Sequence, residues 1–260
     1  MSRTIRVALT NGVVRVALAR PEVKNAFNAE LIAELTSALR SYARHKDVLA
    51  LVMAAEGSMF CAGADFNWMR AQKESSPDAN LSDAGALYDM FYELYAFPHP
   101  TIARVQGGAF GGGAGLVACC DFVVMAENAT LAFSEVRIGL VPATISPFVV
   151  RKIGEGRARE FFLTGAMISP AQALSAGLVN QVVPVEGLDG AVEECLSQII
   201  ACGPQALGVT KEILREVPQL SLAEARGFTA ERIAKQRNSA EGQEGMAAFL
   251  EKRKPKWFKA

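Results

Sequence analysis

The first third of the chain alternates between strand-like and helix-like patterns. In residues 4–21, TIRVALTNGVVRVALARP, apolar and polar positions alternate on both sides of Asn11 and Gly12, which is the strongest short signal for a β-hairpin. From Asn28, apolar side chains recur at helical spacing as far as residue 46, so we expect a helix with Asn28 as its N-cap. Residues 48–54, VLALVMA, are almost wholly apolar, as in a strand buried on both faces.

The middle of the chain continues this order. Residues 70–83, RAQKESSPDANLSD, are polar and are the best candidate for a mobile loop, and a helical pattern follows from Leu87 until Pro98 ends it. A glycine-rich turn then leads into a further helix at residues 107–117, GGAFGGGAGLV. Three segments have strand patterns, namely TIARVQ at 101–106, FVVMA at 122–126 and TLAFSE at 130–135. The repeated order of strand, helix and strand predicts an α/β fold.

The last third is different in character. Successive helical patterns are separated by Gly and Pro, at residues 146–165, 169–178, 188–203, 204–218 and 221–237. We therefore divide the chain into a first domain of residues 1–195 and a helical region of residues 196–260, with the change falling between Pro184 and Pro204.

Composition narrows the class of protein. Lys plus Arg equals Asp plus Glu at 27 each, so net charge gives no reason to expect nucleic acid or an anionic membrane as a partner. Neither a signal segment nor an apolar run of the ~20 residues that span a bilayer is present, and we expect a cytoplasmic protein. The five cysteines form no CxxC pair and only two histidines exist, so we expect free thiols and no metal site.

The glycine-rich turn does not have the pattern of a phosphate-binding loop. A P-loop ends in Gly-Lys-Ser/Thr, and residues 107–117 contain none of Lys, Ser or Thr. Most of the glycines are explained by close packing or a positive φ. Three in a row at a strand-to-helix junction also leave backbone N–H groups open, which suits an oxyanion site if a second donor lies nearby. Residues 60–65, FCAGAD, follow the strand at 48–54 and offer one.

Three motifs together resemble the enoyl-CoA hydratase/isomerase, or crotonase, superfamily. They are FCAGAD at 60–65, ARVQGGAFGGGAGLVACCDFVVMAENATLAFSEVRIGLVP at 103–142 and LTGAMISPAQALSAGLVNQVVP at 163–184. The resemblance covers nearly the whole chain. It implies a spiral of ββα units followed by a C-terminal helical trimerisation region, a homotrimer or homohexamer, and an acyl-CoA thioester as substrate. It implies no separate cofactor, because coenzyme A enters as part of the substrate.

The resemblance also implies which residues form the site. The oxyanion donors would be the N–H groups of Ala64 and Gly112, and Glu135 would be the general acid and base. Related hydratases have a second glutamate at the position of Gly115, which has no side chain here. The residues expected to bind the coenzyme A part are Lys24, Ala26, Ala62 and Asp65.

The resemblance therefore implies a hydratase of the lyase class that adds water across a 2-enoyl-CoA double bond. The sequence around Gly115 is most similar to bacterial hydratases of 3-methylglutaconyl-CoA or isohexenylglutaconyl-CoA, from leucine or terpene catabolism. A glycine there is expected to leave room for a branched acyl group, and Arg137 to meet the substrate's distal carboxylate or simply to lie at the surface. The alternatives are a Δ3-Δ2 enoyl-CoA isomerase, a short-chain hydratase of fatty-acid β-oxidation, and a non-catalytic acyl-CoA-binding or RNA-binding module.

Overall fold

The computed structural model describes residues 4–72 and 75–258, and these form two compact units. The first unit comprises the chain up to Phe97 together with Thr101–Val192, and the second comprises Pro98–Pro100 together with the chain from Glu193 onward. The division after Val192 falls inside the helix α7, Leu188–Ile200, whereas the sequence placed the boundary after residue 195.

A six-stranded sheet organises the first unit, in the order β1-β2-β3-β4-β6-β8. Only β1 and β2 are antiparallel, and every other neighbouring pair is parallel. The strands are β1 (Ile5–Thr10), β2 (Val13–Leu18), β3 (Ala50–Ala55), β4 (Thr101–Val105), β6 (Phe122–Ala126) and β8 (Gln181–Val183). Two further short strands, β5 (Ala109–Phe110) and β7 (Leu131–Ala132), pair separately in parallel.

Several elements form where their patterns predicted them. Asn11 and Gly12 both have positive φ and join β1 to β2, as the hairpin signal required. The side chain of Asn28 accepts a 2.9 Å hydrogen bond from the Leu31 N–H at the start of α1 (Ala29–Ala43). The apolar run at 48–54 becomes β3, which is central in the sheet and whose first four residues are buried.

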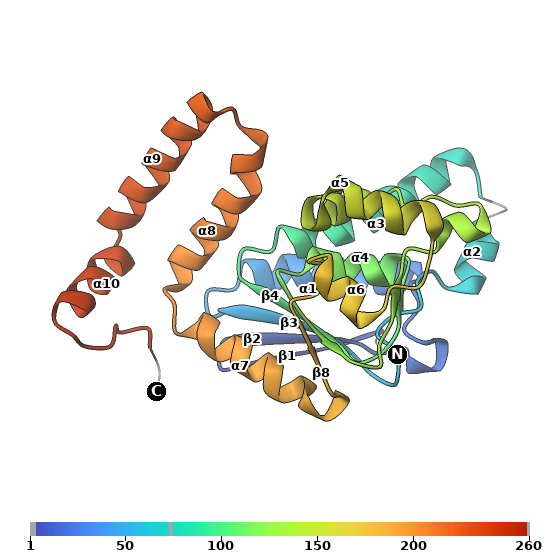
Figure 1. The fold of residues 1–260 in the computed structure, drawn as a ribbon, viewed down its shortest axis with the longest axis horizontal. Helices are drawn as coiled ribbons and strands as arrows, with labels where there is room; N and C mark the ends of the chain where they lie inside the picture. The colour runs from blue at the N-terminus through green and yellow to red at the C-terminus, as the bar shows by residue number, and fades with distance from the viewer. Residues whose placement is uncertain (1–3, 73–74, 259–260) are drawn as a thin grey trace. The chain divides into compact units, whose positions relative to one another are not determined.

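Helices of the first unit cover one side of this sheet. Figure 1 shows α1, α3, α4 and α5 on the same side, and α3 packs against both α1 and α4 while α5 packs against α4. After α1, the helices of this unit are α2 (Phe66–Gln72), α3 (Pro77–Tyr95), α4 (Gly112–Cys119), α5 (Ser146–Thr164) and α6 (Pro170–Ser175), followed by the first part of α7. The core between sheet and helices is apolar and includes fully buried Phe27, Phe91, Leu35, Leu51 and Met53.

The prediction of a mobile loop at residues 70–83 is wrong for most of this segment. Gln72 ends α2, and α3 begins at Pro77, where Ser76 accepts a 3.2 Å hydrogen bond from the Ala79 N–H as the N-cap. Residues 73–74 lie outside the described residues. The segment is polar because the first turns of α3 are exposed on nearly all sides, and a Ser-Pro start is itself a helix signal.

Differences of extent appear elsewhere. The strand expected over 130–135 is limited to β7, and Glu135 begins a short 3₁₀ turn, Glu135–Ile138. The strands β5 and β8 were not predicted, because runs of two or three residues are too short for an alternation to be recognised.

The second unit is helical, as expected. It contains α8 (Pro204–Glu216), α9 (Leu222–Asn238) and α10 (Ala240–Leu250), of which α10 was not among the predicted helices. In the part of the chain that the structure describes, every helix is too short or too polar to cross a bilayer.

Candidate functional site

The two glycine-containing turns singled out in the sequence meet at their backbones. Cys61 and Ala109 form a parallel bridge, in which the Cys61 N–H donates to the Gly108 carbonyl at 3.2 Å and the Phe110 N–H donates to the Cys61 carbonyl at 2.9 Å. The expectation that residues 60–65 and 107–117 converge is therefore confirmed. The donors predicted on these two segments belong to one continuous backbone arrangement.

The direction of the Ala64 N–H follows from a second bridge. The Phe27 N–H donates to the Gly63 carbonyl at 2.7 Å, and the Asp65 N–H donates to the Phe27 carbonyl at 2.8 Å. Ala64 lies between these two residues in a parallel bridge with Phe27, so its own N–H points away from Phe27. Ala64 as a whole residue is exposed.

Gly112 is the first residue of α4, where backbone N–H groups have no partner inside the helix. Gly111 precedes it with a φ of 51°, a conformation that favours glycine, and donates its own N–H to the Ala132 carbonyl at 2.8 Å. A Cβ on Gly112 would lie 2.7 Å from Cε2 of Phe27. A side chain at Gly112 would thus displace Phe27, which is the residue that pairs with Ala64.

Glu135 faces this turn from the start of the 3₁₀ turn that follows β7. The pairing of β5 with β7 places the two segments side by side, and Oε1 of Glu135 lies 3.3 Å from the point that a Cβ on Gly111 would occupy. Its Oε2 is buried without a hydrogen-bond partner. Burial raises the pKa of Glu135, against a smaller opposite effect of the hydrogen bond from its own N–H. A partly dehydrated carboxylate beside two backbone turns is suited to accepting and returning a proton.

Gly115 does not leave open space. A Cβ at this position would overlap the Cγ2 methyl of Ile145 and would lie 3.2 Å from Cε1 of Phe91. Ile145 is only 1% exposed. The expectation that Gly115 makes room for a branched acyl group is therefore wrong, because Ile145 fills the volume that a side chain at 115 would take.

The residues expected to bind coenzyme A are gathered around the Ala64 turn. The Ala62 N–H donates to the Lys24 carbonyl at 3.0 Å, which places the exposed Lys24 beside the turn. Ala26 is buried, and its carbonyl accepts a 2.5 Å hydrogen bond from Arg20. The backbone thus brings Lys24, Ala26 and Ala62 close to Ala64.

Asp65 is engaged by the protein itself. Its Oδ2 lies 3.0 Å from Nη2 of Arg20, and its Oδ1 accepts hydrogen bonds from the N–H groups of Asn67 at 2.8 Å and Trp68 at 3.4 Å. Burial opposes ionisation, but these hydrogen bonds and the charge of Arg20 outweigh it and lower the pKa of Asp65. The carboxylate therefore stabilises the start of α2 and the turn before it.

Sequence reasoning missed two residues that shape this region, Arg20 and Asn25. Asn25 is fully buried with a φ of 56°, and its amide donates to the carbonyls of Glu56 and Met59 at 2.8 and 2.9 Å. Its Oδ1 accepts the Arg20 N–H at 2.9 Å. Asparagine tolerates left-handed backbone better than most residues, and a Lys-Asn pair after a Pro-initiated turn was the available signal.

Cys61 is a packing residue rather than a nucleophile. The thiol is buried, its Sγ donates to the Asn25 carbonyl at 3.1 Å, and burial raises its pKa to about 12. Within the described residues, no group of three or more His, Cys, Asp or Glu side chains is arranged to hold a metal ion.

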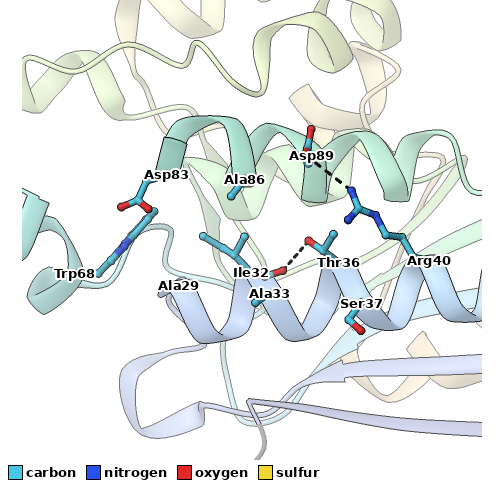
Figure 2. A pocket seen from close by; sticks show the side chains of 10 residues that line it. All are labelled: Ala29, Ile32, Ala33, Thr36, Ser37, Arg40, Trp68, Asp83, Ala86 and Asp89. Atoms are coloured by element: carbon cyan, nitrogen blue, oxygen red, sulfur yellow. Dashed lines mark hydrogen bonds and ion pairs between the residues drawn. The ribbon is translucent and has the colours of Figure 1, made fainter. Parts of the chain in front are cut away.

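Two surface cavities lie near Trp68. A groove of about 400 Å³ runs between α1 and α3, with Trp68 and Asp83 at one end and the ion pair of Arg40 with Asp89 at the other (Figure 2). A second cavity of about 310 Å³ is bounded by Arg20, Asp65 and Trp68, among others. Neither lining includes Gly112 or Glu135, so neither cavity is the space between the two turns.

Comparison with known proteins gives a consistent result. A family model described as enoyl-CoA hydratase/isomerase matches residues 8–260. A putative enoyl-CoA hydratase of Thermus thermophilus is 34% identical over 245 residues, which cover 94% of this chain and 97% of that protein. An enoyl-CoA hydratase crystal structure from Shewanella pealeana superposes with a TM-score of 0.94 at 37% identity, covering 98% of this chain and 96% of the other. Pseudomonas aeruginosa AtuE has a TM-score of 0.95 at 34% identity, covering 98% and 99%.

Proposed function

This chain belongs to the enoyl-CoA hydratase/isomerase family and is an enzyme of the hydratase type, and we propose that it hydrates a 2-enoyl-CoA thioester with one carboxylate, Glu135. The observation that carries the proposal is the buried, unpartnered Oε2 of Glu135 beside the turn at Gly111. A buried carboxylate oxygen without a partner is costly, and it is retained where a substrate or water completes its hydrogen bonding.

In this mechanism, the thioester carbonyl oxygen accepts hydrogen bonds from the N–H groups of Ala64 and Gly112. Water attacks C3 of the enoyl group while Glu135 accepts one of its protons, and the electron pair of the double bond moves onto the carbonyl oxygen. The enolate then collapses as Glu135 returns the proton to C2. The two donors stabilise the enolate more than the neutral thioester, which lowers the barrier.

The same carboxylate serves as base and acid in turn. Glu135 must be ionised to accept the proton of water and protonated to deliver it to C2, so its pKa has to lie nearer the working pH than that of an exposed glutamate. Burial acts in this direction. Support for a single-acid mechanism comes from Gly115, since Ile145 occupies the space that a second acid would need.

For the coenzyme A part, we assign Lys24, Ala26, Ala62 and Asp65 to the wall of the binding site. The exposed Lys24 supplies a positive charge for a phosphate. Next to Lys24, the small side chains of Ala62 and Ala26 leave the backbone open to the ligand. Asp65 contributes by holding the turn, because both its oxygens are engaged within the protein.

As a finer proposal, the acyl group is of the branched glutaconyl type and carries a distal carboxylate. Ile145 fills the space beside Gly115, so extra volume for a branched acyl group does not explain this preference. A positively charged side chain that binds the distal carboxylate would explain it. Arg137 is exposed, two residues after Glu135, and its Nε donates to the Gly165 carbonyl at 2.7 Å, which fixes the direction of the guanidinium. Its terminal nitrogens are suited to a bidentate contact with a carboxylate.

The proposed reaction is tested with a panel of crotonyl, 3-methylcrotonyl, 3-methylglutaconyl and 3-enoyl CoA thioesters, followed by mass spectrometry for the gain of one water. Glu135→Gln should lower kcat by about 10²- to 10⁴-fold, the usual contribution of a general acid and base. Glu127→Gln, an exposed glutamate after β6, serves as the matched control. Equal turnover by the wild type and Glu135→Gln would contradict the mechanism, and isomerisation without water gain would identify an isomerase.

The acyl preference has its own test. Arg137→Ala should lower kcat/KM for 3-methylglutaconyl-CoA by roughly 10- to 100-fold, the range expected for a lost hydrogen bond to a charged group, and should leave crotonyl-CoA turnover unchanged. An equal effect on both thioesters would remove Arg137 from substrate selection.

We also propose that copies of the chain associate through the second unit into a trimer or hexamer. Large apolar side chains on its helices are strongly exposed, among them Leu222 at 93%, Phe249 at 83% and Leu250 at 78%. Exposed apolar surface of this kind is typical of an interface. Light scattering should give a multiple of the chain mass, and Phe249→Glu together with Leu250→Glu should reduce it.

A further inference from the structure

A buried ion pair lies directly behind the turn that carries Ala64. Nη2 of Arg20 lies 3.0 Å from Oδ2 of Asp65, and Nη1 of the same guanidinium donates to the Ala26 carbonyl at 2.5 Å. The side chains of Arg20 and Asp65 are only 16% and 9% exposed. One guanidinium therefore holds both backbone segments that form the bridge between Phe27 and Ala64.

The two segments determine where the Ala64 N–H points. Phe27 bonds to the residues on either side of Ala64, through the Gly63 carbonyl and the Asp65 N–H. Gly63 has a φ of 95°, which makes this turn easy to deform unless both ends are held. The bridge between Phe27 and Ala64 is isolated and is not part of a longer pair of strands, so only a few contacts define it.

We propose that Arg20 and Asp65 are positioning residues that orient the Ala64 N–H toward the thioester oxygen. This inference rests on the proposed function, because it assigns a role to a donor of that same site. The pair acts from behind the turn and touches no reacting atom. Its effect on catalysis is through the direction of one backbone N–H.

The shape of the two side chains suits this role. The planar guanidinium donates to Asp65 and to the Ala26 carbonyl at once, which a lysine ammonium on a flexible stem holds less rigidly. The other oxygen of Asp65 accepts the N–H groups of Asn67 and Trp68, so the carboxylate also fixes the start of α2 behind Ala64. A buried ion pair is weak evidence for stability, since desolvation offsets its attraction. A role in orienting the Ala64 N–H explains the placement of this ion pair better than a role in stability.

The direct readout is the ultraviolet absorbance of a conjugated enoyl-CoA thioester, such as cinnamoyl-CoA, bound to the protein. Two N–H donors at the carbonyl oxygen polarise the conjugated system and shift its band to longer wavelength. We compare the wild type with Arg20→Lys, which keeps the charge, and with Arg20→Met/Asp65→Asn, which leaves no unpaired buried charge. The red shift should shrink in Arg20→Lys and shrink further in the double variant.

Turnover should follow the same order. The loss of one oxyanion donor lowers kcat by about 10²- to 10³-fold, and the double variant should approach this range while KM changes far less. Arg20→Lys should lie between it and the wild type. The matched control is Arg104→Met/Asp189→Asn, which removes a 2.6 Å pair of the same residue types between β4 and α7 and should change neither readout.

The outcomes separate this inference from the proposed function. A wild type that neither hydrates enoyl-CoA nor shifts the bound chromophore contradicts the proposed function. A wild type that does both, with an unchanged red shift and kcat in the Arg20 and Asp65 variants, overturns the positioning role. If the double variant does not fold, Arg20→Lys decides alone, because a fully retained red shift in a folded Arg20→Lys protein counts against the role.

Discussion

Ile145 occupies the volume in which a side chain at residue 115 would have to lie. A Cβ on Gly115 would overlap the Cγ2 methyl of Ile145 and would approach its Cβ to 3.1 Å. Gly115 and Ile145 are both buried, one inside α4 and the other just before α5. The absence of a second acid at Gly115 is thus matched by the presence of a large side chain at Ile145. A glutamate at position 115 would require a smaller residue at position 145 as well.

This pairing predicts a coupled effect on stability. Gly115→Ala should destabilise the protein by roughly 1–3 kcal/mol through overpacking, although alanine is the better helix former. Ile145→Ala alone should cost about 2–5 kcal/mol because it leaves a cavity. The double variant should cost clearly less than the sum, as urea unfolding would measure. Additive costs would show that the two residues do not compete for the same space.

The raised pKa of Glu135 predicts how its charge affects stability. A carboxyl whose pKa is higher in the folded than in the unfolded protein binds more protons when folded, so its contribution to stability is present at low pH and is lost as pH rises through the folded pKa. Glutamine does not ionise, so Glu135→Gln avoids the stability that the wild type loses when Glu135 becomes charged. The variant should therefore gain stability relative to the wild type at pH 7, and the gain should shrink toward pH 4. A gain that does not depend on pH would point to packing instead.

Gly113 predicts a link between packing and catalysis. A Cβ at this position would lie 2.5 Å from the Cys61 carbonyl oxygen and 2.8 Å from the Cys61 Cβ, so Gly113→Ala should push the two turns apart. We expect kcat to fall by up to the ~10²- to 10³-fold that one misplaced donor costs. Gly156→Ala in α5 is the control, because nothing lies within 4 Å of its added Cβ and alanine should stabilise the helix by roughly 0.5–1 kcal/mol. Steady-state kinetics and thermal unfolding of both variants test this link.

The cysteines should differ in reactivity. Cys61 is buried and burial raises its pKa to about 12, whereas Cys202 is exposed. Alkylation with iodoacetamide at pH 8 should therefore label Cys202 in the folded protein and leave Cys61 unmodified, and denaturant should make both reactive. Peptide mass spectrometry distinguishes them. Rapid labelling of Cys61 without loss of fold would contradict the packing role assigned to it.

Local patterns were sufficient for most of the fold. The pair Asn11 and Gly12 predicted the hairpin because only a few residues adopt its positive φ, and the apolar run at 48–54 predicted a central strand because both faces of such a strand are buried. The polar segment 70–83 misled because polarity reports exposure and not backbone conformation. Its Ser76-Pro77 start was the better guide to the helix.

The candidate site was predictable where it depends on motifs and not where it depends on three-dimensional packing. Ala64, Gly112 and Glu135 follow from their motifs, and the structure brings their segments together. The filling of space behind Gly115 by Ile145, thirty positions along the chain, leaves no trace in the sequence. The contact of Arg20 with Asp65 is equally non-local, and an arginine before a proline gave no indication of its partner.

The backbone bridges that join Phe27 to Ala64, Cys61 to Ala109 and Leu131 to Ile168 also affect how such a protein can diversify. A point mutation to any residue except proline replaces a side chain and leaves the peptide N–H in place, so it can misplace a main-chain donor but does not delete it. Lineages that inherit these bridges can accumulate substitutions around the acyl group and acquire new substrates. The main-chain donors proposed for Ala64 and Gly112 would remain in place while the specificity changes.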